Sequence, residues 1–258
     1  MTKSKRPKVV SIHSYRGGTG KSNSTANLAV TIASYGHRVA IVDTDIQSPG
    51  IHVLFGYGEE NLSPCLNDYL WGRCKLSAAA HEMTHVLKGQ EDKGGKVFLV
   101  PSSIKAGDIA RVLREGYDVG LLNDGFQDLM EDLSLDYLLI DTHPGLNEET
   151  LLSITISDVL LLILRPDQQD FQGTAVTVDV ARRLEVPKML MMVNKAPTLF
   201  DFEQLRQKVE SAYEVPVAGI LPHSDDVMML ASNGVFVVNY PDHEVTQTIQ
   251  AIAKQIML

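Results

Sequence analysis

The residues best suited to chemistry stand near the N-terminus, in the glycine-rich segment Arg16-Gly17-Gly18-Thr19-Gly20-Lys21-Ser22. An apolar run ending at Ile12 precedes it, and residues 25–33 after it are typical of a helix. Glycines let successive backbone N–H groups surround an anion, and a helix start adds its positive dipole end. Lys21 can charge-pair with the β- and γ-phosphates of a nucleotide, and the Ser22 hydroxyl can coordinate Mg²⁺. The segment therefore predicts a phosphate-binding loop rather than a glycine turn that binds nothing.

Three aspartates stand at the ends of two other apolar runs. Asp43 and Asp45 close the run that begins at Arg38, and Asp141 closes the run that begins at Tyr137. Such residues often serve turns or helix caps. In a chain with a phosphate loop they favour a Mg²⁺–nucleotide site, because metal-bridged phosphates need carboxylates for Mg²⁺ and its waters.

Apolar runs alternate with amphipathic stretches along the whole chain and predict the elements that position these residues. The predicted strands are 8–14, 38–43, 97–101, 137–141, 159–164, 189–194 and 217–221, and the predicted helices are 22–35, 120–132, 148–157, 171–184, 202–213 and 245–257. The strands are apolar on consecutive positions, which is typical of a parallel sheet covered on both faces. This pattern predicts a doubly wound, mainly parallel α/β sheet that binds ligands at the carboxyl ends of its strands.

Length and composition fit one domain over residues 1–258, with residues 1–7 as a flexible basic tail. The net charge of −9 argues against a general nucleic-acid-binding surface, because neutralising phosphates requires clustered Lys and Arg side chains. Nucleic-acid binding is therefore only weakly supported. Two cysteines, Cys65 and Cys74, make no disulfide framework, so we expect a cytoplasmic protein. No apolar run is long enough to span a bilayer, and the C-terminal helix has too few basic residues for a membrane-surface anchor.

The glycine-rich segment departs from the strict GxxxxGK[ST] pattern at Tyr15 and resembles the deviant Walker motif KGGxGK[ST] of the ParA/MinD family of ATPases. Asp43-Thr44-Asp45 resembles the first switch of that family, and the run from Leu138 to Gly145 resembles its Walker B and second switch. Asn194 is similar to the adenine-contacting asparagine, and the loop from Gly219 to Asp225 resembles the loop beside the base. These matches follow the order of the family from about residue 8 to the C-terminus.

The resemblance implies a switch ATPase that binds Mg²⁺ and ATP, forms a nucleotide-sandwich homodimer and hydrolyses ATP slowly to position or segregate a cellular cargo. A partner protein, not identified by the sequence, would stimulate turnover. Asp45 would orient the attacking water, with Lys21 and Arg16 as the other catalytic residues. The metal would be held by Ser22, Asp43 and Asp141. The implied ATP-binding residues are Arg16, Gly17, Gly18, Thr19, Gly20, Lys21, Ser22, Asn23, Asn194, Pro222 and Asp225.

Two positions differ from the family pattern. Arg16 replaces the signature lysine, which reaches the nucleotide of the partner subunit. A guanidinium can grip phosphate oxygens in a fork, so Arg16 can act in trans as an arginine finger or rest in solvent beside the loop. Asn23 stands where the family has Thr or Ser near the α-phosphate, and its amide can still donate a hydrogen bond there.

Other functions remain as alternatives. Arg16 and His143 could mark a nucleotide-dependent scaffold that has lost turnover, and an ATP-coupled metabolic synthetase could use the same fold. The run from His81 to His85 fits HExxH in a predicted helical stretch, but no third zinc ligand follows. An iron–sulfur carrier needs thiolate ligands, often in a CxxC motif, which the chain lacks.

Overall fold

The computed structural model describes residues 6–89 and 93–258. The predicted basic tail therefore lies mostly outside the described residues. The strands are β1 (Lys8–His13), β2 (Arg38–Asp43), β3 (His81–Glu82), β4 (Lys96–Val100), β5 (Tyr137–Asp141), β6 (Val159–Leu164), β7 (Met189–Ala196) and β8 (Val217–Pro222). The α-helices are α1 (Lys21–Ser34), α2 (Leu66–Leu70), α3 (Ala106–Glu115), α4 (Gly120–Asp132), α5 (Glu148–Thr155), α6 (Gln168–Arg183), α7 (Phe202–Tyr213), α8 (Asp225–Leu230), α9 (Phe236–Asn239) and α10 (Glu244–Met257).

The strands form one eight-stranded sheet in the order β3-β4-β2-β5-β1-β6-β7-β8. Neighbouring strands pair in parallel, except that β3 runs antiparallel to β4. Because β2, β5 and β1 are adjacent, their carboxyl ends lie together, with Asp43 opposite Asp141 and Asp141 opposite Ile12. The sheet therefore brings the glycine-rich loop and the strand-end aspartates to one edge.

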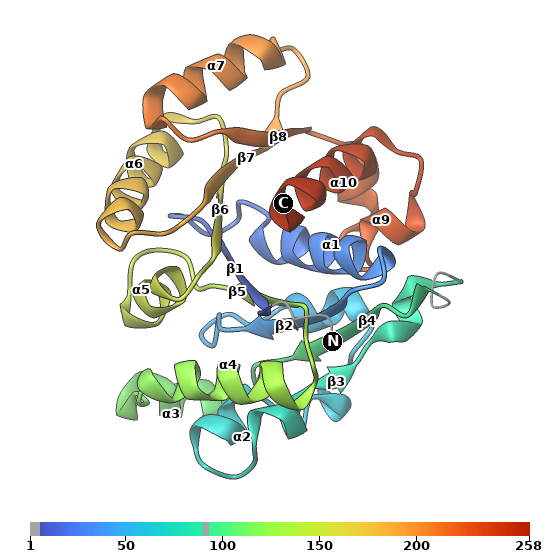
Figure 1. Ribbon diagram of the computed structural model, residues 1–258, viewed down its shortest axis with the longest axis vertical. Helices are drawn as coiled ribbons and strands as arrows, with labels where there is room; N and C mark the ends of the chain where they lie inside the picture. The colour runs from blue at the N-terminus through green and yellow to red at the C-terminus, as the bar shows by residue number, and fades with distance from the viewer. Residues whose placement is uncertain (1–5, 90–92) are drawn as a thin grey trace.

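Helices cover both faces of the sheet (Figure 1). One face packs against α1, α9 and α10, with Ile12, Ile32 and Ile252 in a shared apolar cluster. The other face packs against α2 and α4 over one half of the sheet and against α5, α6 and α7 over the other half. Burial of both faces explains why the strands are apolar on consecutive positions. The predicted doubly wound α/β fold is confirmed.

The C-terminal helix α10 is bound closely to the sheet. Its side chains Ile249, Ile252 and Ile256 are buried. Lys8 Nζ donates to the carbonyl oxygens of residues 256 and 257, and Lys188 Nζ donates to that of residue 255. These ammonium groups donate hydrogen bonds to the last carbonyl oxygens of α10, which have no partner within the helix. No helix in the described residues is long and apolar enough to cross a membrane.

The predicted helix through His81–His85 is wrong. His81–Glu82 forms β3, and Thr84–Leu87 is a short 3₁₀ helix. Met83 N donates to Val97 O at 2.7 Å, and Glu82 accepts from Lys96 Nζ at 3.1 Å. Pairing of this segment with the edge of β4 therefore overrides the local helix propensity of the preceding alanines. The structure also contains the short or amphipathic helices α2, α3, α8 and α9, which the sequence prediction did not include.

Candidate functional site

The glycine-rich loop joins the end of β1 to the start of α1. Gly18 and Gly20 have φ of 76° and 91°, in the left-handed region that favours glycine. A Cβ at Gly20 would also overlap Nδ2 of Asn194. That amide donates to Thr19 O at 2.7 Å, and Lys195 Nζ donates to Gly18 O at 2.9 Å. The end of β7 therefore supports the loop from outside.

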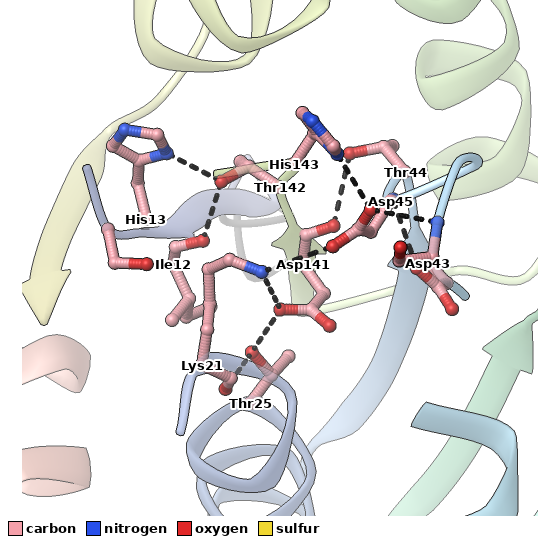
Figure 2. Close-up of polar contacts among 12 residues, drawn as sticks. Ile12, His13, Lys21, Thr25, Asp43, Thr44, Asp45, Asp141, Thr142 and His143 are labelled. Atoms are coloured by element: carbon pink, nitrogen blue, oxygen red, sulfur yellow. Dashed lines mark hydrogen bonds and ion pairs between the residues drawn. The ribbon is translucent and has the colours of Figure 1, made fainter. Parts of the chain in front are cut away.

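Lys21 lies beneath the loop with only 7% of its surface exposed. Its Nζ is 3.6 Å from Asp141 Oδ1 and 3.8 Å from Asp45 Oδ2, so the ammonium lies between two strand-end carboxylates (Figure 2). The Thr25 hydroxyl lies 3.2 Å from the same Asp141 oxygen. In the structure, Lys21 is thus the cation that balances the acidic cluster.

The carboxylates of Asp43 and Asp141 are completely buried. Burial raises the pKa of Asp43 well above its usual value, and the charges of Asp141 and Asp45 raise it further. Burial also raises the pKa of Asp141, against the opposing effect of Lys21. Among the described residues, neither Asp43 Oδ2 nor Asp141 Oδ2 has a hydrogen-bond partner. Two orphaned, buried carboxylate oxygens at a strand edge are a donor set suited to a hard cation.

The described residues contain no preformed group of three or more His, Cys, Asp or Glu side chains that could hold a metal. Mg²⁺ sites on nucleotides commonly use one or two carboxylates, with waters and phosphates as the other ligands. Ser22 follows Lys21 in the first turn of α1, and a hydrogen bond from its hydroxyl lowers the pKa of Asp141. The residues present therefore fit Mg²⁺ shared with a nucleotide better than a self-sufficient metal centre.

Two histidines join this cluster. His143 Nδ1 lies 2.7 Å from Asp45 Oδ1. His13 Nδ1 lies 2.8 Å from the Thr142 hydroxyl, which donates to Ile12 O at 3.0 Å. Burial, together with the nearby charge of Lys21, lowers the pKa of His13 to about 3, so this ring is neutral. Sequence reasoning did not name His13, and it considered His143 only as a mark of lost turnover. Their position beside the loop and after Asp141 is the signal that could have indicated them as site residues.

Arg16 points to α6 rather than along its own loop. Its Nη1 is 3.4 Å from Asp170 Oδ1 and 3.7 Å from Asp167 Oδ1. The neighbouring Tyr15 lies against α6 at Gly173, where a Cβ would overlap its ring. The Arg16 side chain is still 39% exposed. The loop is therefore anchored to the start of α6 at both residues.

A pocket of about 390 Å³ lies beside the loop, lined by Asn23, Asn194, Pro222 and apolar side chains of α8, α9 and α10. This is the region in which a base was expected. Both polar ends of Asn194 are engaged within the chain, since its Oδ1 accepts from Lys195 N. The Asp225 side chain is 92% exposed and lies 4.0 Å from His223. The structure thus brings Asn23, Asn194 and Pro222 to one pocket, with Asp225 in solvent.

The HExxH residues do not form a zinc site. His81 Nε2 lies 2.8 Å from Pro64 O, and Glu82 pairs with Lys96. His85 lies on the 3₁₀ helix that follows β3. A strand followed by a 3₁₀ turn does not present the two histidines on one helical face, which the motif needs.

A glycine-rich loop between a strand and a helix, with acidic residues at the ends of the neighbouring strands, is typical of P-loop nucleotide-binding proteins. A family model described as ParA, NUBPL iron-transfer P-loop NTPase, matches residues 5–257. The chain therefore belongs to the ParA family of P-loop NTPases, as its sequence motifs predicted.

Known relatives fit this assignment. An uncharacterized ATP-binding protein of Methanocaldococcus jannaschii is 29% identical, over 96% of this chain and 87% of the relative. An iron–sulfur cluster carrier protein of Clostridium perfringens is 26% identical, over 88% and 79% of the two chains. The solved structure of the septum site-determining protein MinD with Mg-ADP from Pyrococcus horikoshii has a TM-score of 0.79 at 20% identity, covering 97% of this chain and 96% of that one. This last likeness supports the fold.

Proposed function

We propose that this protein is a nucleotide-dependent switch ATPase that binds Mg²⁺–ATP, pairs with a second copy around the nucleotides and hydrolyses ATP slowly. The observation that carries the proposal is the position of Lys21, buried under a phosphate-type loop between Asp45 and Asp141. A lysine in that position is the cation that a phosphate loop supplies to the β- and γ-phosphates. The family and the M. jannaschii ATP-binding relative support the nucleotide.

In the proposed mechanism, backbone N–H groups from Gly17 to Lys21 and the Lys21 ammonium hold the phosphates. Ser22, Asp43 and Asp141 hold Mg²⁺, which neutralises charge on the phosphates when bound. Asp45 orients the attacking water. Arg16, released from α6, completes the site of the second copy.

Membership of the ParA family does not determine which cargo the protein acts on. We propose positioning or segregation of a cellular cargo, with a partner protein that stimulates turnover. Iron–sulfur transfer, as in the name of the C. perfringens relative, has less support from the residues. The only cysteines are Cys65 and Cys74, with no CxxC pair. Burial raises the pKa of Cys65 to about 11, which disfavours the thiolate that ligates a cluster.

The test is the mass in solution of the Asp45→Ala protein, by light scattering, with Mg²⁺–ATP and then with Mg²⁺–ADP, beside phosphate release by the wild type. We expect a dimer with ATP only, because the variant hydrolyses ATP too slowly to leave the ATP-bound state during the measurement. We also expect slow Mg²⁺-dependent phosphate release by the wild type. An unchanged mass with both nucleotides would refute the sandwich dimer. Phosphate release that depends strictly on a small co-substrate would favour a synthetase instead.

A further inference from the structure

The two oxygens of the Asp45 carboxylate have different surroundings. Oδ1 lies 2.7 Å from His143 Nδ1 and accepts from Ser48 N at 3.3 Å. Oδ2 lies 3.8 Å from Lys21 Nζ (Figure 2). A carboxylate accepts hydrogen bonds and does not donate them, so the hydrogen in the His143 contact is on Nδ1. Within the part of the chain that the structure describes, one oxygen is thus held by two N–H donors and the other by an ion pair alone.

His143 is itself held in place on both sides. Its carbonyl oxygen accepts from the Thr150 hydroxyl on α5 at 3.3 Å. The preceding residue, Thr142, donates from both its N–H and its hydroxyl to Ile12 O, and its hydroxyl accepts from His13 Nδ1. His13, Thr142 and Thr150 are all fully buried. Contacts with β1 and α5 therefore fix the backbone from which the His143 imidazole projects toward Asp45. The imidazole is thus pre-organised for its contact with Asp45 Oδ1.

Nucleotide binding acts on the two oxygens of Asp45 unequally. Phosphates on the loop attract the Lys21 ammonium, which weakens the ion pair at Oδ2. The contacts of Oδ1 with His143 and Ser48 involve no group of the phosphate loop, so loss of the Lys21 ion pair would not break them. The carboxylate then keeps one fixed oxygen and gains one free oxygen, which is the arrangement needed to accept a hydrogen from a water in a defined position.

We propose that His143 is a positioning residue for ATP hydrolysis: its Nδ1–H holds Asp45 Oδ1 so that Oδ2 meets the attacking water. The inference rests on the proposed function. In this role His143 supports ATP hydrolysis, whereas the scaffold alternative treats the same residue as a sign that hydrolysis has been lost. The imidazole touches neither the water nor the phosphates in this role. Its effect passes entirely through Asp45.

The experiment compares three substitutions at position 143 in the full chain. His143→Asn keeps an N–H donor at about the position of Nδ1, His143→Gln moves the donor one bond further, and His143→Leu removes it at similar volume. Phosphate release under single-turnover conditions gives the rate of hydrolysis. Binding of a fluorescent ATP analogue with Mg²⁺ gives the nucleotide Kd, and thermal unfolding shows whether each variant folds.

We expect His143→Leu and His143→Gln to slow hydrolysis by about 10- to 100-fold, the effect of losing a hydrogen bond to a charged group. Their nucleotide Kd stays within about twofold of wild type, because nucleotide binding does not use this bond, and His143→Asn stays within about threefold of the wild-type rate. In an Asp45→Ala background, His143→Leu has no further effect, because the two residues act as a unit. If the Leu variant fails to fold, the Gln and Asn pair carries the comparison.

Wild-type hydrolysis rates in the Leu and Gln variants, or an added loss in the Asp45→Ala background, would overturn the role of His143 and leave the ATPase proposal intact. A wild-type protein that binds Mg²⁺–ATP and releases no phosphate over many hours would overturn the proposed function and this inference together. The two failures are therefore distinguishable in one set of measurements.

Discussion

Asp43→Asn should stabilise the protein in the absence of metal. The carboxylate is fully buried beside Asp141 and Asp45, and burial with these two charges raises its pKa well above the usual value. Oδ1 accepts from Asp45 N at 3.0 Å, whereas Oδ2 has no partner within the described part of the chain. An asparagine keeps the acceptor and replaces the orphaned, charged oxygen with a neutral NH₂ group, which removes the buried negative charge beside Asp141 and Asp45.

The sign of the pH dependence follows from the raised pKa. The folded state holds the Asp43 proton more tightly than the unfolded chain, so the stability that this group contributes is complete below about pH 4, its unfolded pKa. It is lost as the pH rises through the folded pKa. A buried polar group without a partner costs about 1–3 kcal/mol. We therefore expect Asp43→Asn to gain about 1–3 kcal/mol at pH 8 and little at pH 5, with Tm higher by about 2–4 °C per kcal/mol.

Urea denaturation in EDTA at pH 5, 6, 7 and 8 measures this difference directly. Asp179→Asn is the matched control, because it makes the same chemical change on an exposed face of α6, 4.0 Å from Arg182. We expect the control to change the free energy of unfolding by less than about 0.5 kcal/mol at every pH. A free energy for Asp43→Asn at or below that of wild type at pH 8, or a gain equal at pH 5 and pH 8, would refute the electrostatic reasoning.

Two other substitutions test how the site is held. Lys21→Met removes the buried cation beside Asp141 and Asp45, so we expect the free energy of unfolding in urea to fall by about 3–5 kcal/mol at pH 8. The loss should be smaller at pH 5, which is closer to the pKa of Asp141 that burial raises, and equal losses at both pH values would contradict this. Gly173→Ala places a Cβ in the ring of Tyr15, so we expect weaker binding of a fluorescent ATP analogue, while Gly107→Ala, which meets open space on α3, leaves binding unchanged. Equal binding by both glycine variants would show that Tyr15 does not support the loop.

The parts of the site that could be predicted from sequence are those set by local rules. The glycine loop is a continuous segment between a strand and a helix, and Gly18 and Gly20 adopt the positive φ that such a loop needs. Asp43 and Asp141 end their strands, and parallel strands place their carboxyl ends at the same edge. One segment and one topological rule therefore suffice to bring these residues together.

The histidines could not be predicted in this way. His143 meets Asp45 across 98 residues, and His13 meets Thr142 across 129. These contacts depend on the order of β2, β5 and β1 in the sheet and on the backbone path after Asp141, which no local pattern records. The predicted helix through His81–His85 failed for the same reason, because the pairing of β3 with β4 depends on a strand edge elsewhere in the chain.

The charges of the site explain why a nucleotide and a cation are expected to bind together. Three buried carboxylates, those of Asp43, Asp45 and Asp141, lie around Lys21, which makes ion pairs with only two of them. An anionic phosphate alone would take Lys21 away and leave the acidic cluster without its cation. A divalent cation alone would be repelled by the Lys21 ammonium, which lies at the same carboxylates. In the proposed complex the phosphates would attract Lys21, and the two charges of the cation would match those of Asp43 and Asp141. In the proposed mechanism Asp45 is the carboxylate that holds no metal, with one oxygen held by His143 and the other able to accept from the attacking water.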